Sequence, residues 1–324
     1  MRTVGKDVHV LVWPYVDIGE DKVDPLRDER VLQVLEKSEK VDMEHYCITP
    51  GWSFDVREGP YGIHLATNTL GQFLFTSKER TTVHVYDNNG TFQFSFNPQT
   101  DDAKTKINIA DLVTEDVSEK IYLLIELYNE KQPSEVQVLN KTADLQYKFP
   151  VRSGYRLIVS GSKLVISGSR EAHVYNQNGE FDRCFEFFKS ESDKTFMDDC
   201  TATNEGRILI MHRKGVFSDY HCVHVFTMEG QEIAKFKFGV GLNLYRMFFS
   251  PRSAGEHVVV AGCNCGGEII TVELYTVDGK LVRRILLRQK CRLLFDGITV
   301  TMEGHIAVCF RPFGSNRKVV VFKN

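Results

Sequence analysis

Long hydrophobic runs are scarce in this 324-residue sequence. No apolar stretch approaches the roughly 20 residues that a membrane-spanning helix needs, so we expect no contact with a membrane. The opening segment reads MRTVGKDVHVLVWPYVD and has no long apolar stretch followed by small residues, unlike a secretory signal. We therefore expect a cytoplasmic protein whose eight cysteines are reduced thiols.

Motifs for metal binding and catalysis are also missing. The cysteines are scattered rather than grouped at zinc-binding spacings, so the chain carries no RING domain. The sequence contains no Ser-His-Asp signature, no phosphate-binding glycine loop and no His-Glu-x-x-His motif. These absences predict a protein that is not an enzyme and needs no cofactor.

The chain has little net charge, −3 in total, but its distribution is uneven. The net charge is −5 over residues 1–61, −4 over residues 62–240 and +6 over residues 241–324. The near-neutral total therefore conceals a basic C-terminal quarter. It falls well short of the strongly basic balance typical of DNA-binding domains, so we do not expect DNA as a partner.

What the sequence does contain is one short pattern that returns along the chain. Residues 83–92 read VHVYDNNGTF, an apolar run and a polar turn ending in glycine, which predicts a β-hairpin. A weaker copy is centred on Val34, 51 residues before the first clear one. The third residues of the six clear copies are Val85, Val138, Val174, Val225, Leu274 and Val321.

Each clear copy is accompanied by further short apolar runs, which makes four predicted strands in a repeat of about 47 residues. A single four-stranded blade has two apolar faces and cannot cover either alone, whereas neighbours arranged in a ring cover both. The sequence therefore predicts an all-β protein. Residues 1–324 would form one β-propeller of four-stranded antiparallel blades, with the clear repeats over residues 62–324.

The number of blades depends on the N-terminal 61 residues. If Leu32–Met43 forms an outer hairpin, the propeller has seven blades; if Asp24–Asp42 is an amphipathic helix, it has six. The spacing fits seven without adjustment, and seven is our prediction over six.

The last repeat ends after its third strand, so another segment must complete that blade. A strand from residues 1–61 would close the ring well, making this region either a partial blade or a closure segment. The two candidates are Val8–Trp13 and Trp52–Val56.

The repeats resemble NHL repeats, most clearly at Gly62–Phe96 and Gly297–Phe322. The shared features are a leading Gly-Ile, a Gly-Gln or Gly-His before the second strand, a Val-x-Val-aromatic strand and the glycine turn. The Ala-Asp that usually follows the second strand is missing, since Phe75 is followed by Thr76-Ser77. The resemblance is to the propeller that ends tripartite-motif (TRIM-NHL) proteins. It implies a recognition module that binds protein partners, or RNA in some members, often for a ubiquitin ligase.

Three groups of residues could suggest chemistry. His84, His173 and His224 occupy the same strand position in separate repeats, so a shared packing role is expected rather than a metal site. Cys263-Asn264-Cys265 has no second pair at a useful spacing and is interpreted as a loop. Asp198-Asp199 could bind Ca²⁺ or act in the central channel of a propeller hydrolase, but a solvated acidic loop is the favoured interpretation.

Strands of a blade alternate in direction. The loops that join strand two to strand three therefore lie on the same face of the propeller as the connections between blades. Basic and aromatic residues of the later repeats fall mainly in these loops and connections, so we expect them on that face. Such residues suit an acidic protein segment or an RNA strand. We rank protein binding first, RNA binding second and a metal-dependent hydrolase third. The predicted binding residues are Arg213, Lys214, Phe217, Tyr220, Tyr245, Arg246, Arg288, Lys290, Arg292, Arg311, Phe313, Arg317 and Lys318.

Overall fold

The computed structural model describes most of the chain beyond residue 49. The described ranges are 2–3, 9–13, 50–56, 64–77, 79–101, 105–115, 117–128, 134–152, 154–168, 170–187, 195–214, 221–238, 242–250, 257–264, 269–288, 291–312 and 317–322. Across these ranges, no helix has the length and apolar character to cross a membrane.

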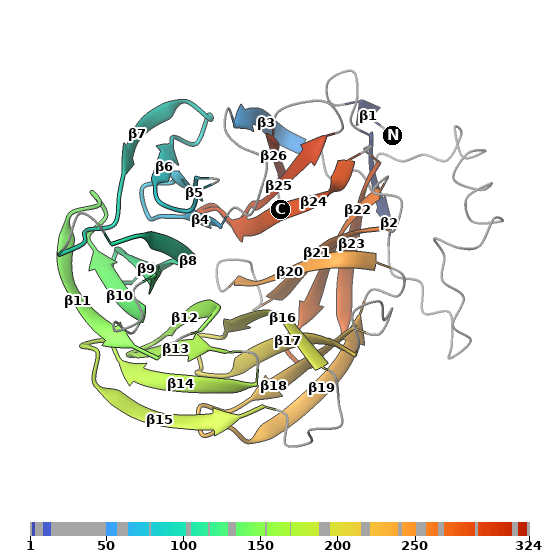
Figure 1. The fold of residues 1–324 in the computed structure, drawn as a ribbon. Coiled ribbons are helices and arrows are strands. Elements are labelled where there is room, and N and C mark those ends of the chain that lie inside the picture. The colour runs from blue at the N-terminus through green and yellow to red at the C-terminus, as the bar shows by residue number, and fades with distance from the viewer. Residues whose placement is uncertain are drawn as a thin grey trace.

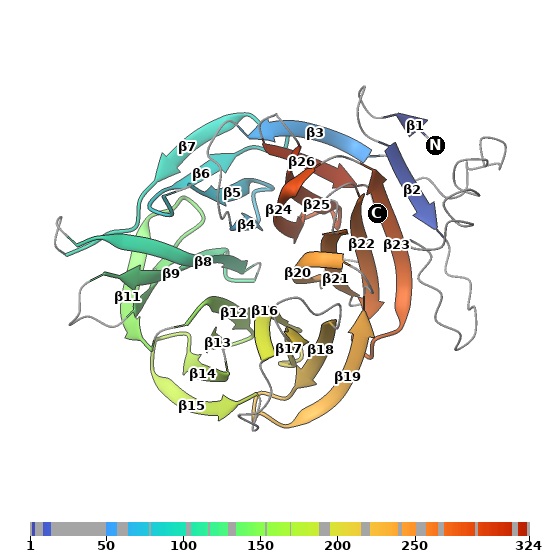
Figure 2. The ribbon, with the colours of Figure 1, turned by 45° about the vertical axis from the view of Figure 1, so that its right-hand side comes forward.

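The described residues form six antiparallel sheets arranged around a central axis (Figures 1 and 2). Each sheet is one blade, and its first strand lies nearest the axis. The strands of the first three blades are β4 (Leu65–Thr67), β5 (Phe73–Thr76), β6 (Val83–Tyr86) and β7 (Phe92–Phe96); β8 (Ile107–Glu115), β9 (Lys120–Leu127), β10 (Ser134–Leu139) and β11 (Leu145–Val151); and β12 (Arg156–Ser160), β13 (Lys163–Ser167), β14 (Glu171–Asn176) and β15 (Phe181–Glu186).

The last three blades follow the same plan, with additions from the N-terminal region. Their strands are β16 (Thr195–Ala202), β17 (Ile208–Lys214), β18 (His221–Phe226) and β19 (Glu232–Phe238); β20 (Leu242–Ser250), β21 (His257–Asn264), β22 (Ile269–Thr276) and β23 (Leu281–Arg288), extended by β2 (His9–Trp13) and β1 (Arg2–Thr3); and β24 (Cys291–Val300), β25 (Ile306–Pro312), β26 (Arg317–Phe322) and β3 (Pro50–Val56).

The ring has six blades, so the prediction of seven is wrong. The sixth blade packs directly against the first: Phe54 and Cys309 share one buried cluster with Phe73 and Phe75. A blade inserted between these two blades would separate side chains that bury one another. Both segments on which the count depended, Leu32–Met43 and Asp24–Asp42, lie outside the described residues.

The predicted closure of the ring is confirmed for one of its two candidates. Strand β3 pairs with β26, with Phe54 opposite Val319, and so supplies the fourth strand of the sixth blade. The other candidate, here β2, pairs instead with β23 and adds a fifth strand to the fifth blade. The propeller is therefore closed by backbone hydrogen bonds between β3, near the N-terminal end of the described chain, and β26, near its C-terminal end.

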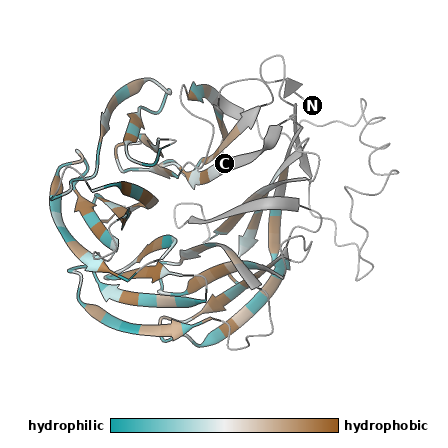
Figure 3. Cartoon of the chain, in the orientation of Figure 1, coloured by the Kyte–Doolittle hydropathy of each residue, from teal (hydrophilic) through white to brown (hydrophobic). Residues whose placement is uncertain are grey.

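The core lies between the blades, in six apolar clusters (Figure 3). The second strand of each blade is the most deeply buried; Phe73, Leu164 and Ile208 are fully covered. Because these strands have neighbours on both faces, they read as continuous apolar runs rather than as alternating patterns. This arrangement explains why the repeat was visible in the sequence.

At four of the six interfaces between neighbouring blades, called seams here, a phenylalanine of one blade's outer strand contacts the glycine turn of the next blade. In the third blade, a Cβ added to Gly179 would overlap the ring of Phe149 from the second blade. The same ring lies 6.5 Å from that of Tyr175. The other pairs of phenylalanine and glycine are Phe54 with Gly90, Phe185 with Gly230, and Phe236 with Gly279.

Candidate functional site

The innermost strands bring one residue per blade to the same level around the axis. These residues have equivalent positions in the strand pairing of their blades. His64 directly precedes Leu65, which lies opposite Phe75 of the second strand, and Arg156 directly precedes Leu157, which lies opposite Ile166. Neighbouring innermost strands contact one another around the ring. The six residues, called here the channel belt, are His64, Asp111, Arg156, Asp199, Arg246 and Gly297.

His64 and Asp111 form the first contact of the channel belt. The Nδ1 atom of His64 lies 2.8 Å from the Oδ1 atom of Asp111, and both residues are buried. The backbone N–H groups of Leu112 and Leu157 also donate to this carboxylate, at 2.9 and 2.8 Å. Asp111 therefore connects the first, second and third blades.

The charges of this pair follow from its surroundings. Burial lowers the pKa of His64 and outweighs the opposing effect of Asp111. Burial opposes ionisation of Asp111 as well, but His64, Arg156 and the Leu157 N–H together lower the pKa of its carboxyl group. We conclude that a neutral His64 donates its Nδ1–H to an ionised Asp111.

Arg156 and Asp199 form the second contact of the channel belt. The Nε atom of Arg156 donates to the Oδ1 atom of Asp199 at 2.8 Å, and the backbone N–H of Cys200 donates to the same oxygen at 3.1 Å. Burial opposes the charge of Arg156, but the carboxylates of Asp199 and Asp111 raise its pKa. One guanidinium is thus stabilised by two buried carboxylates, which belong to the blades on either side of it.

Burial also determines the state of the neighbouring thiol. It raises the pKa of Cys200 well above its ordinary value, and the nearby Asp199 carboxylate acts in the same direction. Cys200 is therefore a protonated, buried thiol and a poor nucleophile.

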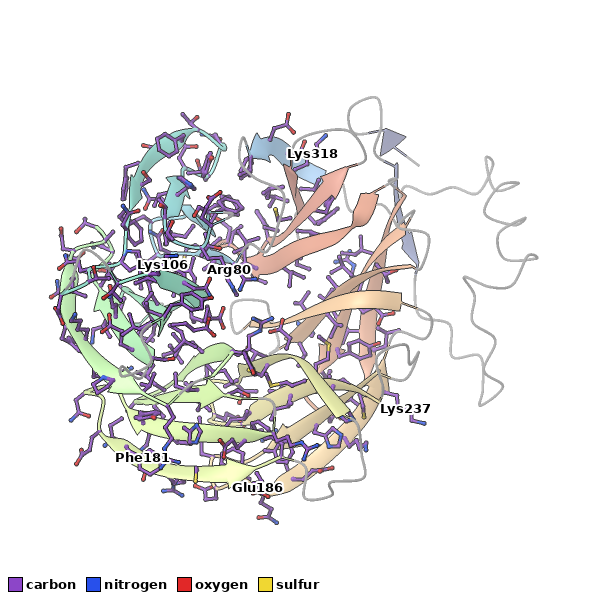
Figure 4. The ribbon with its side chains drawn as sticks, viewed as in Figure 1. Arg80, Lys106, Phe181, Glu186, Lys237 and Lys318 are labelled. Carbon is purple, nitrogen blue, oxygen red and sulfur yellow. The ribbon has the colours of Figure 1, made fainter. Side chains whose placement is uncertain are left out.

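Arg80 lies in the loop from strand two to strand three of the first blade (Figure 4). Its backbone is in the left-handed region, with φ 54°, and its carbonyl accepts a hydrogen bond of 2.6 Å from the N–H of Ile109 in the next blade. Its side chain is half-buried, and its charge helps to lower the pKa of His64. Arg80 thus places a cation close to His64.

The predicted basic residues gather mainly at one end of the last three blades. Lys214 ends β17 opposite the start of β16, Arg288 ends β23, and Arg317 begins β26 opposite the end of β3. Antiparallel pairing therefore brings these positions to the same end of their sheets. We call this end the basic end and define it as Arg213, Lys214, Arg288, Arg292, Arg311, Arg317 and Lys318.

The other predicted binding residues are placed differently. Tyr245 and Arg246 lie within β20, and Arg246 occupies a position of the channel belt. Lys318, labelled in Figure 4, has a half-buried side chain and pairs in register with Asp55. Four residues lie outside the described ranges: Phe217, Tyr220, Lys290 and Phe313.

Three acidic residues lie at the same end of the second blade, opposite in charge to the basic end. Asp101 and Glu135 lie 2.8 and 3.8 Å from the Nζ atom of Lys148, and Glu126 accepts a hydrogen bond from Asn108. The carboxylates of Asp101 and Glu135 are therefore partly neutralised by Lys148 of the same blade.

Two interpretations of the suggestive residue groups are corrected. Asp199 is not part of a solvated loop: it lies in β16, is 7% exposed and pairs with Arg156. Cys263 and Asn264 end β21 rather than forming a loop, because they pair with β20.

The three histidines of the third strands lie in separate blades, as expected. His84, His173 and His224 each pair with the middle of the second strand of their own blade. Among the described residues, no group of three or more His, Cys, Asp or Glu side chains could hold a metal ion.

His64, Asp111 and Arg156 are not among the residues predicted from the sequence. A signal for them is present, because they occupy the same place in successive repeats and charge alternates from Asp111 to Arg246. This signal consists of a single polar or charged residue beside an apolar strand in each repeat, and it becomes apparent only when the repeats are aligned.

No protein-family model and no curated protein sequence matches this chain. Solved structures are similar in shape. The Dos1 propeller has a TM-score of 0.47 at 14% identity, covering 81% of this chain and 70% of that one. Streptogramin B lyase has a TM-score of 0.48 at 14% identity, covering 84% and 97%. The WD40 domain of Pan2 from Neurospora crassa has a TM-score of 0.51 at 11% identity, covering 85% of this chain and 95% of that domain, and this similarity shows a shared β-propeller fold.

Proposed function

We propose that this protein is a non-catalytic recognition module that binds an acidic segment of a protein partner at the basic end. The observation that carries the proposal is the placement of seven cationic residues at one end of three adjacent blades. Opposite charges on a partner would be attracted to this region and held in one orientation.

The second blade supports an orientation for that partner. Its Asp101, Glu126 and Glu135 give the same end of the ring an acidic part opposite in charge to the basic end. A partner segment with acidic residues alone would be repelled there and attracted to blades four to six. Lys148 reduces the negative charge of the second blade but does not reverse it, because this one cation lies near two carboxylates.

The resemblance to NHL repeats supports a further part of the same proposal: the partner is delivered to a ubiquitin ligase in the cytoplasm. Cys184, Cys200, Cys222 and Cys309 are not joined in disulfides within the described ranges, which is compatible with a reducing compartment. Loss of binding at the basic end should then prolong the lifetime of the partner in cells.

The direct test measures binding of two fluorescent probes, a glutamate-rich peptide and a single-stranded RNA, by anisotropy. The variant Arg288→Glu/Arg317→Glu reverses two charges of the basic end and should weaken peptide binding about tenfold or more. The control Arg207→Glu/Lys280→Glu makes the same change in charge near the opposite ends of blades four and five. It should bind the peptide as the natural protein does.

Other results would overturn the proposal. Equal loss in both variants would mean that net charge, rather than the basic end, controls binding. Tight RNA binding that weakens steeply with salt, without peptide binding, would assign the basic end to RNA.

A further inference from the structure

The outer strands of the blades differ in how they protect their free edges. An edge strand exposes unpaired N–H and C=O groups, and charged residues or proline usually prevent other chains from pairing with it. Four outer strands carry such residues: β11 reads LQYKFPV, β15 FDRCFE, β19 EIAKFKF and β3 PGWSFDV. The outer strand β23 contains three arginines and is covered by β2.

Strand β7 is the exception among the outer strands that the structure describes. It reads FQFSF and contains neither a charge nor a proline. Phe92 is 52% exposed and Phe94 is 37% exposed, although both are large apolar side chains. Strand β7 pairs with β6 only, so within the described part of the chain its other edge has no backbone partner.

A second copy of the same strand suits this edge. In an antiparallel pair with two-fold symmetry centred on Phe94, that residue lies opposite its own copy and Gln93 lies opposite Ser95, with no charges brought together. The same operation on β11 or β19 would place Lys148 or Lys235 opposite itself, and like charges in that position destabilise a sheet. Unlike β11 and β19, β7 can therefore pair with its own copy about its central residue without opposing like charges.

The rings around Phe94 support the pairing geometrically. Its ring centroid is 6.4 Å from that of Phe96 on the same strand. A two-fold axis at Phe94 would bring two such pairs together as an aromatic cluster. Phe92 lies beyond the bulge in the β6–β7 register and packs against Tyr86, at 5.6 Å between ring centroids. It can keep that contact in the dimer.

The fifth blade shows that the rim of this propeller accepts an additional strand. Strand β2, with the mostly apolar sequence HVLVW, pairs antiparallel with the outer strand β23. We propose that β7 does the same with β7 of a second copy, so that two propellers join rim to rim through one continuous sheet. This inference concerns the rim and is independent of the proposed function of the basic end.

The test is sedimentation of the full chain over a concentration series. The natural protein should dimerise as its concentration rises. Phe94→Lys and Phe94→Glu should each be monomeric, because like charges would face each other across the axis, and an equimolar mixture of the two should recover the dimer. The control Ile233→Lys adds the same charge to a 47% exposed side chain on the rim strand β19 and should dimerise normally.

A natural protein that remains monomeric at every concentration would overturn the inference. So would a mixture of the two Phe94 variants that stays monomeric while thermal unfolding shows both to be folded, or an Ile233→Lys variant that loses the dimer equally.

Discussion

At the scale of single residues, the glycine turns of the outer hairpins have two separate requirements. Gly179 has a φ of +89°, a region that residues with a Cβ rarely adopt. It also leaves room for Phe149 of the preceding blade. The first requirement was visible in the sequence, because glycine recurs after polar turn residues. The second was not, because the phenylalanine belongs to another repeat.

Gly179→Ala and Gly161→Ala separate these two requirements within the third blade. Both glycines have positive φ, but a Cβ on Gly161 would meet nothing within 4 Å. We expect Gly161→Ala to lower the free energy of unfolding by about 1 kcal/mol through the backbone alone. Gly179→Ala should lower it by roughly 2–4 kcal/mol, because a clash is added. Equal losses in urea unfolding would mean that the contact with Phe149 is unimportant.

At the scale of strands, the innermost strand of the third blade carries both packing and charge. Strand β12 contributes Leu157 to the core and Arg156 to the channel belt. Its guanidinium lies between the carboxylates of Asp111 and Asp199, from the strands on either side. The channel belt thus joins neighbouring blades at their inner edge through hydrogen bonds and ion pairs.

Removing Arg156 should therefore destabilise the protein more than removing the whole ion pair. Arg156→Met removes the guanidinium that donates to the buried Asp199 carboxylate and should cost roughly 3–5 kcal/mol. The double variant Arg156→Met/Asp199→Leu removes both charges and should recover more than half of that loss. Urea unfolding of the two variants measures the difference. A double variant no more stable than the single one would contradict this account of the channel belt.

At the scale of the whole molecule, one strand decides whether the ring is closed. Strand β3 is far in sequence from β26, yet it completes the same sheet and packs on the first blade. Phe54 carries much of this contact, since its ring lies 5.3 Å from that of Phe73 and 6.4 Å from that of Tyr86. The seam between the sixth and first blades therefore depends on a residue outside the predicted repeats.

Phe54→Ala should open this seam. Truncation of a buried phenylalanine costs roughly 3–5 kcal/mol, and here the loss would fall on the closure of the ring. We expect a lower melting temperature and faster proteolysis near β3. Asp55→Ala, at an exposed position of the same strand, is the control and should change neither. Similar proteolysis of the two variants would show that closure does not depend on Phe54.

The sequence by itself determined the local structure of this protein. The four strands of each repeat, the hairpin glycines and the need for a closing strand from residues 1–61 could be read from short patterns, because they depend on neighbouring residues and on the need to bury apolar faces. Membership of the NHL-repeat family remains a prediction.

Only the tertiary structure decided the number of blades, the partners of Asp111 and Arg156, and the place of Val8–Trp13. These features depend on contacts between residues far apart in the chain, and the hydrophobic pattern alone does not specify which distant segments meet. Ring closure selects them, because the first and sixth blades must cover each other's apolar faces and no further blade fits between them.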